Sequence, residues 1–517
     1  MARWDDGYVT DVTYTTNFYR EMTPIWLATT ALLLGQRPPD LTRPFRYADL
    51  GCGNGTTALV VAATCPLAEV WGFDFNPAHV EWANGLAARA GLSNVRFVEA
   101  SFADLAARPE TALPAFDFIA SHGVLSWISP ENRRQLMEVV RQRLKPGGLA
   151  YMSYNVTTGW ASMVPVRALM RMLLEESGGR SDQASTYILD YLDRLKTAGA
   201  GFFELNPTVA SRLTDMRVQD ARYLAHEFLN RDWHPLMFAD VADEMAEAKC
   251  TYFGSATLTD NIDSVSAPPK VLPLLGEAGD VYLRETLRDF GMAQAFRRDV
   301  YRRGLAPIPT PEQQALVEEL TLVSLGQAIP DPVTFKTPMG SVTVANELYR
   351  PMLTAMDEAP LSLRRARALP SSAGRSLVEL LQGFTLMIAS GYGHPQMPGG
   401  DSVAARDGAR RLNRALAEVN VSGGEMPRLA APTIGSSIQV DLLETLLVGA
   451  LLAGQPAMVE SLAAATLAGL ARAGRTMQRD GKSVTDPGEM QRMAAEVARA
   501  MLERRVPVLR GLGVLEG

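Results

Sequence analysis

Cysteine is scarce in this chain, with three among 517 residues. Cys52, Cys65 and Cys250 show no spacing typical of metal ligands. So few thiols in so long a chain also exclude a disulfide framework. We therefore predict no metal site and no disulfide-stabilised fold.

Long apolar runs are also missing. The longest, around 445–459, is bounded by Glu444 and Glu460 and is too short to span a bilayer. The first residues, Met-Ala-Arg-Trp-Asp-Asp, lack the basic start and apolar run of a signal peptide. We therefore expect a cytoplasmic protein without membrane insertion.

Positive charge is not in excess either. The chain has 50 Lys and Arg against 57 Asp and Glu, which gives a net charge of −7. Such a chain has no general attraction for the phosphate backbone of DNA or RNA. We therefore expect no nucleic-acid partner.

What is present is an ordinary globular composition, with 47% hydrophobic and 21% charged residues. The length predicts two to four domains, at roughly 100–200 residues each. From Phe45 onward, strands alternate with helices, which is typical of a doubly wound, mostly parallel α/β sheet. The expected strands are 46–50, 69–73, 95–98, 116–121 and 148–154, and the expected helices are 56–64, 77–90 and 131–144.

The remaining segments are mainly helical. A long stretch without a clear strand, an amphipathic helix at 238–248 and a sixth strand at 250–256 predict a helical insertion between the fifth and sixth strands. A charged helix pair is expected at 281–303, and a hairpin at 333–336 and 341–344. The resulting division is an N-terminal helical lid (1–45), a core (46–258) with an insertion (160–235), a helical middle segment (259–306) and a mainly α C-terminal domain (311–517).

A glycine-rich turn follows the first expected strand: Asp49-Leu50-Gly51-Cys52-Gly53-Asn54-Gly55. Glycines are needed where the backbone turns sharply or approaches a ligand closely. Taken alone, the turn could simply join strand to helix, or hold the pyrophosphate of a dinucleotide.

Three neighbouring features favour a different ligand. Asp49 would repel a pyrophosphate but suits a cofactor with a cationic sulfonium and ammonium. Asp74 ends the second strand, where a carboxylate can accept hydrogen bonds from ribose hydroxyls. Lys145-Pro146-Gly147-Gly148 precedes the fifth strand.

At these three points the sequence resembles the class I S-adenosylmethionine-dependent methyltransferases. The resemblance implies an α/β Rossmann-like methyltransferase core, S-adenosyl-L-methionine as donor and S-adenosyl-L-homocysteine as product. It puts the methionine part against Asp49 and the loop glycines, the ribose against Asp74 and the adenine against Phe75. The full set of cofactor-binding residues expected on this basis is Tyr19, Asp49, Gly51, Gly53, Asn54, Gly55, Asp74, Phe75, Ser101, Phe102, Ser121, His122 and Gly123.

One position departs from the family pattern. The family usually places an acid after the third strand to meet the adenine amino group, and here Ser101 stands in that place. Ser121, His122 and Gly123 end the fourth strand and should face the sulfonium side. For His122, a structural role stays open beside a functional one, and Cys52 is expected to be a small packed residue.

The methyl acceptor needs its own residues. Methyl transfer from a sulfonium requires an aligned nucleophile and exclusion of water. An amine must also lose its proton, against a free lysine pKa of about 10.4. Aromatic walls and a carboxylate or tyrosine hydroxyl would assist. The catalytic candidates are Tyr14, Tyr154, His226 and Glu227, with a core role open for Tyr14 and a helix-surface pair open for His226 and Glu227.

The likeness continues beyond the core. Stretches at 154–160, 226–230, 253–256, 284–298 and 429–436 resemble bacterial methyltransferases with a methyltransferase regulatory domain, including rickettsial protein-lysine methyltransferases that modify outer-membrane proteins. This resemblance implies N-methylation of lysine in a protein or peptide. The Asn/Asp-Pro-Pro-aromatic signature of DNA amino-methyltransferases is absent, because 76–78 and 206–208 do not match it.

Two other functions stay open. The insertion could close a pocket for a small-molecule acceptor of secondary metabolism, or the chain could be a cofactor-binding regulator without transfer activity. The C-terminal domain could present a polypeptide to the core, or form a homodimer through the apolar stretch at 440–470.

Overall fold

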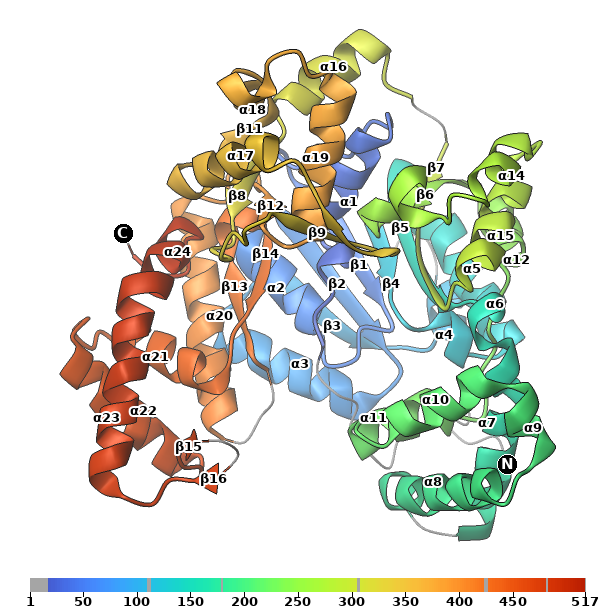
Figure 1. The fold of residues 1–517 in the computed structure, drawn as a ribbon, viewed down its shortest axis with the longest axis horizontal. Helices are drawn as coiled ribbons and strands as arrows, with labels where there is room; N and C mark the ends of the chain where they lie inside the picture. The colour runs from blue at the N-terminus through green and yellow to red at the C-terminus, as the bar shows by residue number, and fades with distance from the viewer. Residues whose placement is uncertain are drawn as a thin grey trace.

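A seven-stranded sheet lies at the centre of the molecule (Figure 1). The computed structural model describes residues 17–108, 113–177, 180–304, 307–422, 426–479 and 482–516. The strands follow the order β3-β2-β1-β4-β5-β7-β6, in which only β7 runs antiparallel to its neighbours. This arrangement confirms the predicted α/β class. The strands are β1 (Phe45–Leu50), β2 (Ala68–Asp74), β3 (Val95–Glu99), β4 (Phe116–Ser121), β5 (Leu144–Asn155), β6 (Cys250–Ser255) and β7 (Phe296–Arg303).

The expectation of a helix pair at 281–303 is wrong in its second half. Helix α15 (Val281–Met292) is present, but β7 follows it and fills the gap between β5 and β6. Strand β7 has the sequence Phe-Arg-Arg-Asp-Val-Tyr-Arg-Arg. Its charged residues interrupt the apolar pattern by which a buried strand is usually predicted. One of these charges, Arg297, pairs with Glu285 and Asp289, which lie outside the strand.

Helices cover both faces of the sheet. On one face lie α1 (Pro24–Leu33), α2 (Thr56–Thr64) and α3 (Pro77–Arg89), and on the other α4 (Phe102–Ala107), α5 (Pro130–Arg143) and α12 (Phe238–Glu247). Every residue of α2 is buried, because α20 (Val403–Val421) of the C-terminal part packs over it. A Cβ at Gly408 would lie 2.4 Å from the Ala63 carbonyl oxygen, so this close packing requires glycine.

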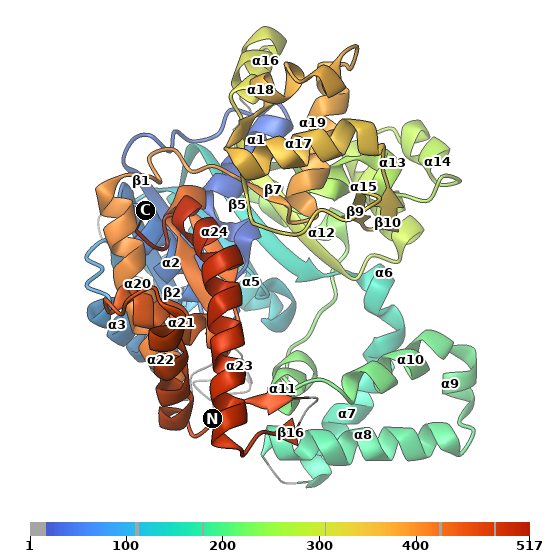
Figure 2. The same cartoon turned by 60° about the vertical axis from the view of Figure 1, so that its left-hand side comes forward.

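The insertion between β5 and β6 is a helical unit with its own hydrophobic core (Figure 2). It starts and ends at the same edge of the sheet, because Val156 bridges Leu236 and the Leu236 amide donates to the Asn155 carbonyl oxygen over 2.8 Å. This return places its last helix beside the carboxyl ends of the strands. Its helices are α6 (Thr157–Trp160), α7 (Val164–Ser177), α8 (Ser181–Thr197), α9 (Gly201–Leu205), α10 (Pro207–Met216) and α11 (Ala221–Phe228).

The C-terminal part is mainly helical and includes the predicted hairpin, β9 with β10. Its position against α2 and α3 is visible in Figures 1 and 2. The domain boundaries given above stay a prediction. Three short helices precede this part: α13 (Asp263–Ser266), α14 (Leu272–Glu277) and α15. Its own elements are α16 (Thr310–Glu318), β8 (Thr321–Ser324), β9 (Thr334–Thr337), β10 (Gly340–Thr343), α17 (Asn346–Glu358), β11 (Leu361–Ser362), α18 (Leu363–Arg367), α19 (Leu377–Ala389), β12 (Gly393–Pro395), α20, β13 (Arg428–Ala431), β14 (Ser436–Gln439), α21 (Leu442–Leu452), α22 (Val459–Arg472), β15 (Gln478–Arg479), β16 (Lys482–Ser483), α23 (Pro487–Ala500) and α24 (Val506–Gly511). Among the described residues, no helix combines the length and apolar character needed to cross a membrane.

Candidate functional site

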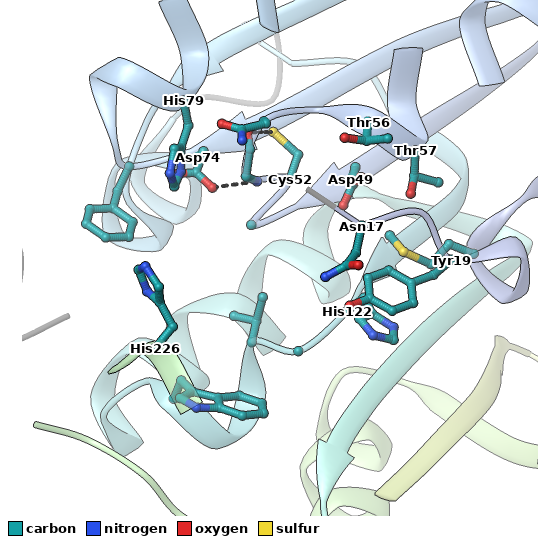
Figure 3. A pocket seen from close by; sticks show the side chains of 18 of the residues that line it. Asn17, Tyr19, Asp49, Cys52, Thr56, Thr57, Asp74, His79, His122 and His226 are labelled. Carbon is teal, nitrogen blue, oxygen red and sulfur yellow. Dashed lines mark hydrogen bonds and ion pairs between the residues drawn. The ribbon is translucent and has the colours of Figure 1, made fainter. Parts of the chain in front are cut away.

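A cavity opens at the carboxyl ends of β1, β2 and β4, the usual ligand position in an open α/β sheet (Figure 3). The N-terminal segment before α1 and the insertion helix α11 complete its walls. The lining residues are Asn17, Tyr19, Met22, Asp49, Gly51, Cys52, Gly53, Asn54, Thr56, Thr57, Asp74, Phe75, His79, Phe102, His122, Gly123, Val124, Trp127, Ile128, His226 and Glu227.

The glycine loop forms one wall and is not an anion cradle. The amides of Gly51 and Cys52 both donate to the Phe73 carbonyl oxygen, over 2.8 and 3.0 Å. The Gly53 amide donates to Asp74 Oδ2 over 2.8 Å, and the Gly55 amide to the Cys52 carbonyl oxygen over 2.9 Å. A pyrophosphate site needs such amides pointing at the ligand. These four amides are already used within the protein, which argues against a dinucleotide.

Two of these glycines are required by the backbone. Gly51 has φ +78°, and a Cβ there would lie 2.6 Å from Val124. Gly53 has φ +52°, and a Cβ there would meet nothing within 4 Å. Left-handed φ values disfavour other residues at both positions. Gly53 therefore keeps its turn while leaving its side of the loop open to the cavity.

Asp49 gives the cavity an uncompensated carboxyl group. Its side chain is 2% exposed, and its Oδ1 atom has no hydrogen-bond partner in the described part of the chain. Burial raises the pKa of Asp49 to about 8, with a smaller contribution from the nearby Asp74 carboxylate. A buried carboxyl in this state is stabilised by a cationic ligand group. The cavity therefore suits an ammonium at this end.

Asp74 is held in place by its neighbours. Its Oδ1 atom accepts from the Asn76 amide over 2.9 Å and lies 3.3 Å from His79 Nδ1, and its Oδ2 atom accepts from Gly53. These contacts fix both oxygens at the cavity wall (Figure 3). The arrangement leaves the lone pairs not used by these donors for the hydroxyls of a ligand.

Tyr19 and His122 form an aromatic stack on the opposite wall. Their ring centroids lie 3.5 Å apart at 22°. His122 Nδ1 is 2.7 Å from the Tyr151 hydroxyl oxygen, and burial holds the pKa of His122 well below its ordinary value. His122 is therefore a neutral ring that positions Tyr19.

Helix α11 contributes the remaining polar groups. His226 is buried and reaches toward the cavity from the side opposite Asp74 and His79 (Figure 3). Burial raises the pKa of Glu227 to about 7, which the nearby Asn155 side chain partly opposes. Glu227 forms no ion pair with any described residue, so its carboxyl is available at the cavity wall.

The structure brings most of the predicted cofactor and catalytic residues together, although their individual roles stay predictions. Those lining the cavity are Tyr19, Asp49, Gly51, Gly53, Asn54, Asp74, Phe75, Phe102, His122, Gly123, His226 and Glu227. Gly55, Ser101, Ser121 and Tyr154 do not line it, and Tyr14 lies outside the described residues.

Gly55, Ser101, Ser121 and Tyr154 each make contacts elsewhere in the protein. The Tyr154 hydroxyl donates to Asp299 Oδ2 over 2.6 Å on the far face of the sheet, which argues against contact with an acceptor. Ser121 donates to the Leu50 carbonyl oxygen, and Ser101 caps α4 in a capping box with Asp104. Gly55 packs against Phe97, where a Cβ would lie at 2.4 Å.

Sequence reasoning missed several polar residues of the cavity, namely Asn17, Thr56, Thr57, His79 and Trp127. His79 lies in the first turn of α3, and its spacing after Asp74 could have indicated it. Trp127 follows β4 in a short 3-10 helix, and its Nε1 atom is buried with no hydrogen-bond partner among the described residues. An unpaired indole N–H at a cavity wall is a donor ready for a ligand.

A buried group of charges joins β7 to α15. We call it the β7 charge cluster, and its members are Glu285, Arg288, Asp289, Arg297 and Asp299. Arg297 reaches Asp289 over 2.6 Å, Glu285 over 2.8 Å and Asp299 over 2.9 Å. Burial raises the pKa of Asp289 to about 7. The cluster ties α15 to the sheet through charges that compensate one another.

Comparison with known proteins fits this geometry. The description "Methyltransferase domain" matches residues 48–148, and "Predicted methyltransferase regulatory domain" matches residues 220–303. The chain is 34% identical over 521 residues to "Uncharacterized protein sll1526" of Synechocystis, with 99% of each chain covered. This chain belongs to the S-adenosylmethionine-dependent methyltransferases with a methyltransferase regulatory domain. The regulatory domain of this methyltransferase thus includes α11, α12, β6, α15 and β7.

Two further relatives help to delimit the likeness. The methyltransferase is 31% identical over 152 residues to a trans-aconitate 2-methyltransferase of Streptomyces avermitilis, covering 29% of this chain and 52% of that protein. It also shares its fold with PKMT2 from Rickettsia typhi, solved in complex with AdoHcy. The TM-score is 0.71 and the identity 20%, over 98% of this chain and 100% of that chain. The first match is confined to a part of the chain, whereas the second fold spans nearly all of it.

Proposed function

We propose that this methyltransferase transfers methyl groups from S-adenosyl-L-methionine to lysine side chains of a protein or peptide. The rickettsial resemblance of the sequence supports a polypeptide acceptor, and so does the whole-chain similarity to PKMT2 from Rickettsia typhi. The homologous core supports the donor.

The cofactor half of the cavity fits S-adenosyl-L-methionine. Asp49 would pair with its ammonium group, and Asp74 would accept hydrogen bonds from its ribose hydroxyls. The bound cofactor supplies an electrophilic methyl group, and the AdoHcy complex of PKMT2 supports the corresponding product here. The Asp49 carboxyl, which lacks a cationic partner among the described residues, is the feature of this half that most needs a ligand.

The acceptor half carries the proposal for lysine. A lysine amine has a pKa of about 10.4 and must give up a proton before it can attack the methyl carbon. Glu227, with a pKa of about 7, is close to half ionised near neutral pH and can accept that proton. Tyr19 and Trp127 supply aromatic walls for the amine and its aliphatic chain. Within the cavity, Glu227 is the observation that carries the proposal of an amine acceptor.

The test uses the full chain, labelled S-adenosyl-L-methionine and fractionated lysate of the source organism. We expect label in polypeptides and, after complete acid hydrolysis, in methylated lysine. Glu204→Gln changes an exposed glutamate of the insertion and should leave the labelling unchanged, whereas Glu227→Gln should lower it strongly. Label confined to small molecules would overturn the lysine acceptor.

A further inference from the structure

A second cavity of about 460 Å³ lies where the N-terminal segment, β7 and the C-terminal part meet. It shares Tyr19 with the cofactor pocket. Its volume falls in the range of small-molecule pockets, roughly 300–1,000 Å³. No step of methyl transfer described above uses it, so its lining needs a separate explanation.

The lining of this cavity is strongly cationic. It includes four arginines, Arg20, Arg298, Arg428 and Arg505, against one carboxylate, Glu21. Two of the arginines are engaged already. Arg20 lies 3.7 Å from Glu21 and donates to the Ala389 carbonyl oxygen over 3.3 Å, and Arg505 lies 2.9 Å from Glu444.

Arg298 and Arg428 are not compensated in this way. Neither forms an ion pair with any residue that the structure describes. Arg298 Nη1 donates to Thr257 Oγ1 over 3.3 Å and its guanidinium lies 5.0 Å from the centre of the Phe296 ring, while the Arg428 guanidinium lies 5.4 Å from the centre of the Phe18 ring. Burial lowers the pKa of Arg428, with a smaller opposing contribution from Glu21. Its charge is thus partly desolvated with little compensation.

Unpaired polar atoms at the same cavity provide independent support. His394 is 2% exposed; its Nδ1 atom lies 2.9 Å from the Pro395 carbonyl oxygen, and its Nε2 atom has no partner in the described ranges. The same holds for the buried hydroxyl of Ser437 and for Arg298 Nε. Buried polar atoms without partners are rare in native proteins and mark places where a ligand or water completes the bonding.

We propose that this cavity binds a small metabolite carrying carboxylate or phosphoryl groups. The guanidinium group presents a planar fork of donors that matches both oxyanions, and two such groups face the cavity without a carboxylate partner. The oxyanion end would lie at Arg298 and Arg428. The ligand's remaining polar atoms would meet His394 and Ser437. This site adjoins the acceptor half at Tyr19 but would not take the acceptor itself, because a cationic cavity repels a lysine.

The test is calorimetric titration of the full chain with citrate and, separately, with pyrophosphate at constant ionic strength. We expect saturable binding of at least one probe with a Kd below about 1 mM. The tighter probe identifies the group that the site prefers, carboxylate or phosphoryl. Binding of both probes weaker than that limit would overturn the proposal.

Variants locate the site. Arg428→Gln should weaken binding of the preferred probe by about tenfold or more, because it removes the charge-assisted hydrogen bonds to the anion. Arg428→Lys should bind the preferred probe with an affinity between those of Arg428→Gln and the parent. Arg499→Gln removes an exposed arginine from α23 and should change nothing. If Arg428→Gln lowers the melting temperature, Arg298→Gln provides the same measurement, because it removes only a long hydrogen bond to Thr257 and the packing of the guanidinium over Phe296. Unchanged affinity in both variants would place the anion elsewhere and refute the inference.

Discussion

The β7 charge cluster and the cofactor pocket bury the same kind of group in opposite ways. In the cluster, Asp289, Asp299 and Glu285 surround Arg297, so each carboxylate has a cation within 3 Å. In the pocket, Asp49 and Glu227 are also withdrawn from water, yet neither has a cationic partner among the described residues. Buried charge that the protein compensates holds the fold together, whereas buried charge left uncompensated indicates where a ligand binds.

Removing Arg297 should have the largest effect. Arg297→Gln leaves Asp289 and Asp299 without their cation. Glu285 keeps only its longer contacts to Arg284 and Arg288. Breaking such a buried pair costs about 3–5 kcal/mol. We expect a large drop in the denaturant midpoint followed by tryptophan fluorescence. The pKa of Asp289 is already about 7 and rises further without Arg297. Because ionisation of a carboxyl with a raised pKa opposes folding, the folded state loses stability as pH rises. The deficit should therefore be greater at about pH 8 than at about pH 6.

The matched control is Arg134→Gln. Arg134 pairs with Glu131 on α5, where both side chains are exposed. An exposed pair contributes about 0–1 kcal/mol, so this variant should remain close to the parent. Equal destabilisation by the two substitutions would mean that burial does not distinguish the cluster.

Glu227→Gln should affect the rate and not the fold. A positioned general base contributes roughly 10²–10⁴-fold, so we expect kcat to fall by about 100-fold or more. In the parent, Glu227 must be ionised to accept a proton, so kcat should rise with pH through about 7. The variant should lose this limb of the profile. Survival of the limb in the variant would assign the titration to another group.

Asp49→Asn should weaken cofactor binding and stabilise the ligand-free protein. Loss of a charge-assisted contact of roughly 1.5–3 kcal/mol weakens binding about 10- to 150-fold, measured by titration with S-adenosyl-L-homocysteine. The pKa of Asp49 is raised to about 8, so its ionisation opposes folding increasingly as pH rises toward that value. The ligand-free variant should therefore melt higher than the parent, most clearly at about pH 8.

The control for this substitution is Asp401→Asn, at an exposed carboxylate of the C-terminal part. It should change neither cofactor affinity nor melting temperature. Should Asp49→Asn bind S-adenosyl-L-homocysteine as tightly as the parent, the ammonium contact assigned to Asp49 is wrong.

The smallest expected effect joins the two cavities. Tyr19 lines both, so an anion bound beside Arg428 should change the affinity for S-adenosyl-L-homocysteine, by about fivefold at typical coupling energies. Titration with and without saturating citrate or pyrophosphate measures this. The change should disappear in Arg428→Gln. Identical affinities in the parent with and without the anion would show the two cavities to be independent.

Local sequence determined the cofactor half of the pocket. Asp49, Gly51, Gly53 and Asp74 belong to one strand–loop–helix–strand unit, and their spacing alone sets the order in which they meet a ligand. Parallel strands end at the same edge of the sheet, so no distant contact is needed to bring these residues together. The acidic residue that precedes the glycines also disfavours a pyrophosphate, because like charges repel wherever the chain places them.

Only the tertiary structure decided the acceptor half of the pocket and the place of β7 in the sheet. Side chains alternate between the two faces of a strand, so Tyr151 and Tyr154 of β5 lie on opposite faces. Tyr151 lies beside His122, and Tyr154 points into the β7 charge cluster. Strand β7 can lie inside the sheet because Glu285 and Asp289, which lie outside the strand, pair with its Arg297. Glu227 reaches the pocket because the insertion returns to the edge where it began. Contacts between residues far apart in sequence leave no periodic signal, so the sequence alone indicates the donor and the fold decides what surrounds the acceptor.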